Sequence, residues 1–99
     1  MTTMMLRSTM HEENAADVQA ALEKVFQALE QEQPAGVRYT SIRLGDDVTF
    51  VALLELENVE DNPMAALPAY AELLENLKQW QVGPPTVEQV TAIGSYRLF

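Results

Sequence analysis

The segment 49–57, TFVALLELE, constrains the fold more than any other part of the chain. Read as a strand, it has apolar residues on both faces: Phe50, Ala52, Leu54 and Leu56 on one, Val51 and Leu53 on the other. A strand that is covered on one face only alternates between apolar and polar residues. We therefore expect this strand in the interior of a sheet, with other protein packed against both of its faces.

The chain is short for a protein that has to cover both faces of one strand. Its 99 residues correspond to a single domain, residues 1–99. Apolar residues make up 47% of the sequence, which is enough to build a core. A chain of this size buries only roughly 60–65% of its unfolded surface. Self-association is therefore a plausible source of the missing cover.

Three other segments have the alternating pattern of strands. Residues 3–10 place Met4, Leu6, Ser8 and Met10 on one face. Residues 37–45 form a second strand, and Gly45-Asp46-Asp47 is a turn signal that joins it to 49–57 as a hairpin. Residues 86–98 form a long last strand, with one face made of Val90, Ala92, Gly94, Tyr96 and Leu98.

Two segments have helical periodicity. Residues 14–32 carry one apolar stripe, made of Val18, Leu22, Val25 and Leu29. Asn14 can cap this helix. Pro68 separates a short turn at 63–67 from a main helix at 68–80, because a proline inside a helix removes a hydrogen bond and clashes with the preceding turn.

The predicted order is βαββαβ, which gives an α+β, ferredoxin-like fold. It has a four-stranded antiparallel sheet with both helices on one face and with the strands 3–10 and 49–57 at its centre. The uncovered apolar face indicates an interface. We expect a second copy to pack there and form a dimeric α/β barrel. Candidate interface residues are Arg7, Val51, Leu53 and Arg97. We favour Glu55 or Glu57 as ionic partners of the two arginines across the dimer; the arginines could instead hold an anionic ligand.

Composition excludes several functions. The formal charge of −9 opposes binding to nucleic acid and to anionic membranes. There is no cysteine and only one histidine, so we expect no metal site. The longest apolar run, Phe50 to Leu54, is far shorter than the roughly 20 residues of a membrane-spanning helix, and MTTMMLRSTM lacks the apolar core of a signal peptide. We expect a soluble, cytoplasmic protein.

The chain also resembles a known family. The features that match are its length and βαββαβ order, the Asn62-Pro63 opening of the second helical region, the segment LPAYAELLENLKQW (67–80) and the closing IGSYRLF (93–99). Together these resemble the antibiotic biosynthesis monooxygenase-like group of the dimeric α/β-barrel superfamily. The resemblance covers nearly the whole chain, and it is specific for architecture more than for chemistry.

The resemblance implies a homodimer with a cavity between sheet and helices in each subunit. Superfamily members include cofactor-independent oxygenases of polycyclic phenols, haem-degrading enzymes and muconolactone isomerase-like proteins. The haem-degrading branch uses a histidine on the second helix, and residues 63–80 contain none. The oxygenase branch is associated with an asparagine and a tryptophan near the cavity. Asn62 and Trp80 are of these types, but the resemblance assigns them no catalytic role.

Five residues are candidates for a cavity or ligand site, and each has a plainer interpretation. His11 could act as a general base or lie on the surface. Asn62 could polarise a substrate oxygen or cap the turn after it. Tyr70, Trp80 and Tyr96 could stack on a flat ligand or belong to the core.

Two functions remain open. The first is an enzyme, a cofactor-independent oxygenase or isomerase acting on a small aromatic or polyketide-like molecule; in an oxygenase the substrate would supply the reducing electrons, and no cofactor is expected. The alternative is a non-catalytic dimeric binding or structural module. A cavity of roughly 300 Å³ or more with converging polar groups would favour a ligand site. A core filled by Phe26, Tyr70 and Trp80 would favour the structural role.

Overall fold

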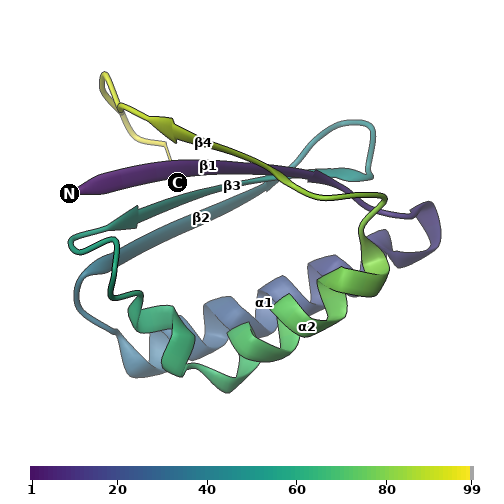
Figure 1. Cartoon of the computed structure of the whole chain (residues 1–99), viewed down its shortest axis with the longest axis horizontal. Helices are drawn as coiled ribbons and strands as arrows, with labels where there is room; N and C mark the ends of the chain where they lie inside the picture. Colours follow the sequence, from purple (N-terminus) through teal and green to yellow (C-terminus); the bar gives the residue numbers. More distant parts are fainter. Residues whose placement is uncertain (99) are drawn as a thin grey trace.

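The computed structural model of the chain describes residues 1–98, which form two layers, a sheet and a pair of helices that cover one of its faces (Figure 1). The elements are β1 (Thr2–Thr9), α1 (Ala15–Glu32), β2 (Val37–Arg43), β3 (Thr49–Leu56), α2 (Pro68–Trp80) and β4 (Thr86–Val90). Short 3-10 helices, Glu12–Asn14 and Pro63–Ala66, precede α1 and α2. The sheet is antiparallel with the order β2-β3-β1-β4. The predicted βαββαβ order, the hairpin and the two central strands are confirmed.

The core lies between the sheet and the helices. Phe50, Leu54 and Leu56 of β3 are buried and face this layer, as the alternation in 49–57 predicts. From the helical layer, Val18 and Val25 of α1 and Leu73 of α2 pack into the same core. The other face of β3 carries Val51 and Leu53, which remain partly exposed in the single chain.

The start of α1 differs from the prediction. The Asn14 side chain makes no capping hydrogen bond; its amide donates to Oδ2 of Asp17 at 3.1 Å instead. An N-cap residue normally has an extended backbone, whereas Asn14 (φ −107°, ψ −1°) already lies in the helical region at the end of the preceding 3-10 turn. The helix is thus continued from Glu12–Asn14 rather than started by a cap.

The second helical region follows the prediction closely. Oδ1 of Asn62 accepts a hydrogen bond from the Met64 backbone N–H at 3.0 Å and so caps the 3-10 helix Pro63–Ala66. The main helix α2 begins at Pro68 and ends at Trp80. Proline is tolerated at the first position of a helix because that N–H has no partner within the helix.

The last strand is much shorter than predicted. The prediction was 86–98, but β4 ends at Val90. In the pairing of β4 with β1, Val90 lies opposite Thr3, and β1 itself begins at Thr2. In the same register Thr91 would face Thr2, so residues from Ala92 onward run past the start of β1. Ile93, Tyr96 and Leu98 are exposed in consequence, to 99%, 81% and 65%.

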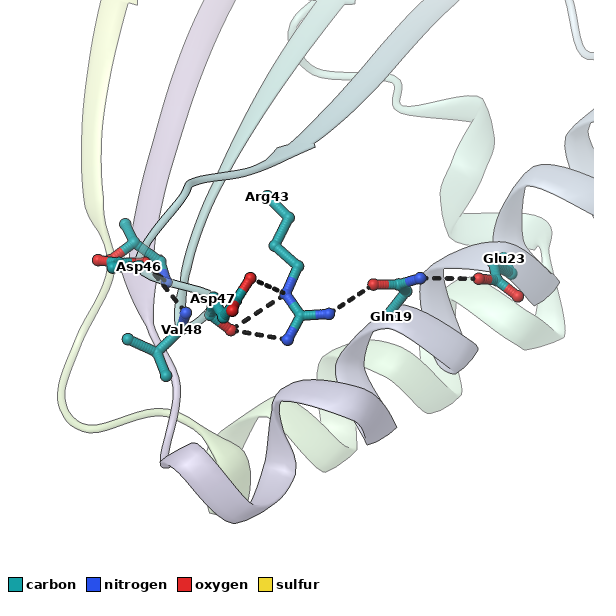
Figure 2. Close-up of polar contacts among 7 residues, drawn as sticks. Gln19, Glu23, Arg43, Asp46, Asp47 and Val48 are labelled. Carbon is teal, nitrogen blue, oxygen red and sulfur yellow. Dashed lines mark hydrogen bonds and ion pairs between the residues drawn. The ribbon is translucent and has the colours of Figure 1, made fainter.

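The turn between β2 and β3 is held by one carboxylate. Oδ1 of Asp46 accepts from the backbone N–H groups of Val48 and Thr49 at 3.0 and 2.8 Å, and Oδ2 accepts from the Thr49 hydroxyl at 2.6 Å (Figure 2). Hydrogen bonds to a carboxylate favour its ionised form. The bond from the Thr49 hydroxyl, followed by those from the two N–H groups, lowers the pKa of Asp46.

An arginine connects the same hairpin to α1. Nε and Nη2 of Arg43 donate to the backbone oxygen of Asp47 at 3.0 and 2.9 Å, and Nη1 donates to Oε1 of Gln19 at 2.7 Å. Gln19 in turn donates to Glu23 at 3.3 Å. Figure 2 shows this chain of contacts running from the turn across to the helix. It fixes the edge strand β2 over α1.

Two adjacent leucines of α2 test the position of the core. Leu73→Ala should lower the free energy of unfolding by about 2–5 kcal/mol, because Leu73 is only 3% exposed and its loss leaves a void. Leu74 is 47% exposed, so Leu74→Ala should cost less than about 1 kcal/mol. Chemical denaturation measures both. Equal losses for the two variants would contradict the orientation of α2.

The Asp46 carboxylate makes stability depend on pH. Its pKa is lowered in the folded protein, so its contribution is present above the unfolded value of about 3.9 and is lost as the pH falls through the folded value. Asp46→Asn mimics the protonated side chain, so the stability gap between wild type and variant should be largest near pH 7 and should vanish in acid. Denaturation curves across this range measure the gap. Asp47→Asn is the control, because it leaves all three hydrogen bonds in place; a gap for Asp46→Asn that does not change with pH would contradict this role.

Candidate functional site

A cavity of about 180 Å³ lies between the inner face of the sheet and the helices. Its walls are mostly apolar, and its polar groups are the side chains of Ser8, Tyr39, Ser41, Tyr70 and Gln81. β1, β2 and β3 supply one wall, and α1 and α2 supply the other. Leu74 and Pro85 also line it and are exposed, which places its opening between α2 and the segment that leads into β4.

Tyr70 lies close to the cap that precedes its helix. The Asn62 side chain acts on the Tyr70 hydroxyl as a hydrogen-bonding neighbour and lowers its pKa. Oδ1 of Asn62 accepts from the Met64 N–H, which leaves the amide NH₂ group to face the phenol. One asparagine thereby caps a 3-10 helix and neighbours a phenol that lines the cavity.

Tyr39 reaches the cavity from the opposite wall. Its ring stacks on Phe26 of α1 with centroids 5.4 Å apart, and it meets Tyr70 edge-to-face at 6.5 Å. Ser41, two residues further along the same face of β2, is a polar neighbour that lowers the pKa of Tyr39. The rings of Tyr39 and Tyr70 are therefore in contact, and each tyrosine has a polar neighbour of its own.

The cavity is electrically neutral. Of residues 1–98, those that line it include no acidic, basic or histidine side chain. Burial is the largest effect on both phenols and raises the pKa of Tyr39 and of Tyr70 above the ordinary value. Both hydroxyls are consequently protonated at neutral pH. The site can donate hydrogen bonds to a ligand, but no side chain in it changes charge near pH 7.

The five predicted site residues fall in different places. Tyr70 lines the cavity, and Asn62 lies behind it as its hydrogen-bond partner. Trp80 packs against the core and lines a separate hollow on the outer side of α1 and α2. The side chain of His11 is exposed, and its backbone N–H donates to the Trp80 carbonyl at 2.9 Å. Tyr96 lies in the exposed segment beyond β4, outside the cavity of its own chain.

The predicted interface residues divide in a similar way. Val51 and Leu53 lie on the open face of the sheet, and Arg7 lies on the same face because it pairs with Val51. Arg97 instead lies beyond β4 with its guanidinium over the Tyr96 ring, 5.2 Å from the centroid. It follows the early end of β4, so it does not share the sheet face of Arg7.

Sequence reasoning missed Tyr39, Ser41 and Gln81. A weak signal for the first two was present, because Tyr39 and Ser41 share one face of 37–45 with Val37, but Ile42 and Leu44 make the opposite face apolar as well. Ser8 gave the same signal on 3–10, where it interrupts an otherwise apolar face. A small polar residue on a core-facing strand position indicates either a buried hydrogen bond or a cavity.

Neither a cluster of metal-binding side chains nor a membrane-spanning helix is found among residues 1–98. Within residues 1–98 no group of three or more histidine, aspartate or glutamate side chains could hold a metal ion. No helix in the same range is long and apolar enough to cross a membrane.

Solved structures with the same architecture connect this fold to known proteins. No protein-family model matches the sequence, and no curated protein matches it. In structure, the chain is similar to an antibiotic biosynthesis monooxygenase, with a TM-score of 0.75 and 14% identity over 95% of this chain and 100% of the other. The chain has the fold of the antibiotic biosynthesis monooxygenases.

Two further structures of this fold extend the comparison. One is SnoaB from Streptomyces nogalater, described as a cofactor-independent oxygenase, with a TM-score of 0.66 and 19% identity over 98% of this chain and 97% of SnoaB. Another is a protein from Mycobacterium tuberculosis, with a TM-score of 0.72 and 12% identity over 95% of this chain and 96% of the other. The monooxygenase fold is therefore shared along almost the whole length of each chain.

Asn62→Ala tests the link between the cap and the cavity. The variant should unfold more easily by about 1 kcal/mol, because the Met64 N–H loses its partner. It should also raise the pKa of Tyr70, because the donor that lowers this pKa is gone. Spectrophotometric titration of tyrosinate measures the shift, and Tyr70→Phe identifies the transition.

Asn58→Ala is the matched control, since Asn58 accepts a similar bond from the Glu60 N–H at 3.0 Å in the preceding loop. An unchanged Tyr70 titration in Asn62→Ala would show that the amide does not act on this phenol.

Proposed function

We propose that the cavity binds a small aromatic molecule and that the chain is an enzyme acting on it, an oxygenase or isomerase that uses no bound cofactor. The observation that supports this most is the pairing of an apolar cavity with two tyrosine hydroxyls that face it from opposite walls. Apolar walls with a few placed polar groups are typical of small-molecule sites. The shared fold with SnoaB, described as a cofactor-independent oxygenase, supports the same class.

Cavity size limits the substrate. At about 180 Å³ the cavity is smaller than the roughly 300 Å³ typical of ligand pockets. An apolar cavity of about 150 Å³ can hold one benzene ring. The space therefore suits one substituted ring or two small fused rings, while a polyketide-like molecule of several rings would have to extend through the opening beside Leu74 and Pro85.

The available chemistry follows from the neutral lining. Protonated Tyr39 and Tyr70 can donate hydrogen bonds to a phenolic oxygen and favour its ionised form. An electron-rich phenol could then react with dioxygen itself: one oxygen atom enters the substrate, and the other leaves as water with two hydrogens taken from the substrate. In this reaction the protein orients the substrate and excludes water.

A non-catalytic binding module is the second candidate. The observation that favours it is the same neutral lining, because no group in the described cavity could serve as a general base near pH 7. Such a module would hold the ligand without converting it.

We also propose that the chain forms a homodimer through the open face of the sheet. Val51 and Leu53 need apolar cover there, and the segment after Val90 needs a strand to pair with. Of the two acidic partners expected across the dimer, Glu55 is already bound within its own chain, by Arg38 and by the Thr3 hydroxyl, both at 3.0 Å, which leaves Glu57.

Oxygen uptake tests the enzymatic proposal. Adding one-ring and two-ring phenols to the protein should consume dioxygen with at least one of them, in a ratio of one dioxygen to each substrate. Ala52→Phe places a ring into the cavity from β3 and should abolish uptake while the helical circular dichroism is retained. Binding of the phenols without uptake would favour the non-catalytic module, and uptake that persists in Ala52→Phe would place the reaction elsewhere.

Leu53→Lys tests the dimer. A lysine there puts an unpaired charge into the proposed interface and should shift the protein from dimer to monomer in sedimentation equilibrium, because burying that charge is costly. Ala16→Lys adds the same charge on the exposed side of α1 and should remain dimeric. A monomeric wild type, or a Leu53→Lys variant as dimeric as the control, would contradict this interface.

A further inference from the structure

The two tyrosines of the cavity keep their hydroxyl protons for a ligand. Burial is the largest effect on both phenols and raises their pKa values, so each hydroxyl is protonated at neutral pH. Ser41 near Tyr39 and Asn62 near Tyr70 act in the opposite direction and to a smaller extent. Both rings line the cavity, so each hydroxyl is a hydrogen-bond donor available at its wall.

Tyr39 is better placed than Tyr70 to donate a hydrogen bond to a ligand. Phe26 stacks on its ring at 5.4 Å and Tyr70 abuts it at 6.5 Å, so two aromatic contacts fix the plane of the ring. A donor that is held in place loses little entropy when it binds an acceptor.

The lining also determines the charge of the ligand. A carboxylate that enters the cavity leaves water and meets no cation, because the described lining residues carry none. Burying an unpaired charge is far more costly than burying a neutral carbonyl that gains a hydrogen bond. The net charge of −9 adds repulsion at long range.

We infer that the cavity selects uncharged aromatic ligands of one or two rings that carry a hydrogen-bond acceptor oxygen, and that Tyr39 is the residue that recognises this oxygen. The inference rests on the proposed ligand site and specifies its substrate class. Aromatic acids are excluded, and purely hydrocarbon ligands bind without using Tyr39.

Three probes of nearly equal shape separate these properties. Acetophenone carries a neutral acceptor, benzoate carries the same ring with a charge, and isopropylbenzene has neither. Binding is measured by NMR from the methyl signals of Leu6, Leu22 and Leu77, which line the cavity. Acetophenone should bind at least tenfold more tightly than benzoate. Tyr39→Phe should lower the affinity for acetophenone by roughly three- to tenfold, the usual contribution of one neutral hydrogen bond. It should leave the affinity for isopropylbenzene unchanged.

Two further variants complete the experiment. Tyr96→Phe removes a phenol hydroxyl outside the cavity and should leave the affinity for all three probes unchanged. Ser41→Ala keeps the Tyr39 ring but frees its hydroxyl, so it should weaken acetophenone by a smaller factor than Tyr39→Phe, and it serves as the test if Tyr39→Phe does not fold.

The possible failures are distinct. If benzoate binds as tightly as acetophenone, or if neither Tyr39→Phe nor Ser41→Ala weakens acetophenone, the selectivity is refuted while the ligand site stands. If none of the three probes shifts the cavity methyl signals, the proposed ligand site itself is refuted, and this inference with it.

Discussion

The apolar packing on both faces of β3 is the constraint on which the rest of the structure depends. One face is covered by α1 and α2 and forms the core with Phe50, Leu54 and Leu56. The helices cannot reach the other face, so Val51 and Leu53 remain partly exposed. The single chain therefore leaves one face of the sheet uncovered. The segment beyond Val90 is a second exposed feature. A second copy of the chain could cover the open face of the sheet and also pair with the segment beyond Val90.

The cavity arises because the packing on the covered face is itself incomplete. Serines at positions 8 and 41 and alanine at position 52 stand where larger apolar side chains would fill the space between sheet and helices. Phe26, Tyr39 and Tyr70 form an aromatic group beside this space. Asn62 connects the group to the backbone by capping the 3-10 helix before α2. The proposed ligand-binding role therefore falls to side chains that also build the core, and a core built this way keeps two hydroxyl donors inside an apolar layer.

Local signals in the sequence predicted most of the architecture. The features that were not predicted depend on contacts between segments that are far apart in the sequence. The stripe of α1, the role of Pro68 and the Gly45-Asp46-Asp47 turn each depend on neighbours along the chain. The end of β4 could not be predicted in this way, because it depends on where β1 begins. Only the pairing of Val90 with Thr3, 87 residues earlier in the sequence, reveals that dependence. Trp80 and Tyr70 share one helix and one residue class, and only the packed structure places them in different hollows. Tyr39 was overlooked because, from the sequence alone, it resembles an ordinary core residue. Only the structure shows Ser41 and Tyr70 beside it.

The most direct test of the account is a crystal structure of the protein under xenon pressure. Xenon occupies preformed apolar cavities without needing a specific hydrogen bond, so it reports the space alone. The account predicts xenon between the sheet and the helices, in contact with Leu6, Leu22 and Leu73 and beside the Tyr39 ring. A structure in which α2 has closed onto β1 and β3, with no xenon between the layers, would contradict the cavity and every ligand-binding role built on it.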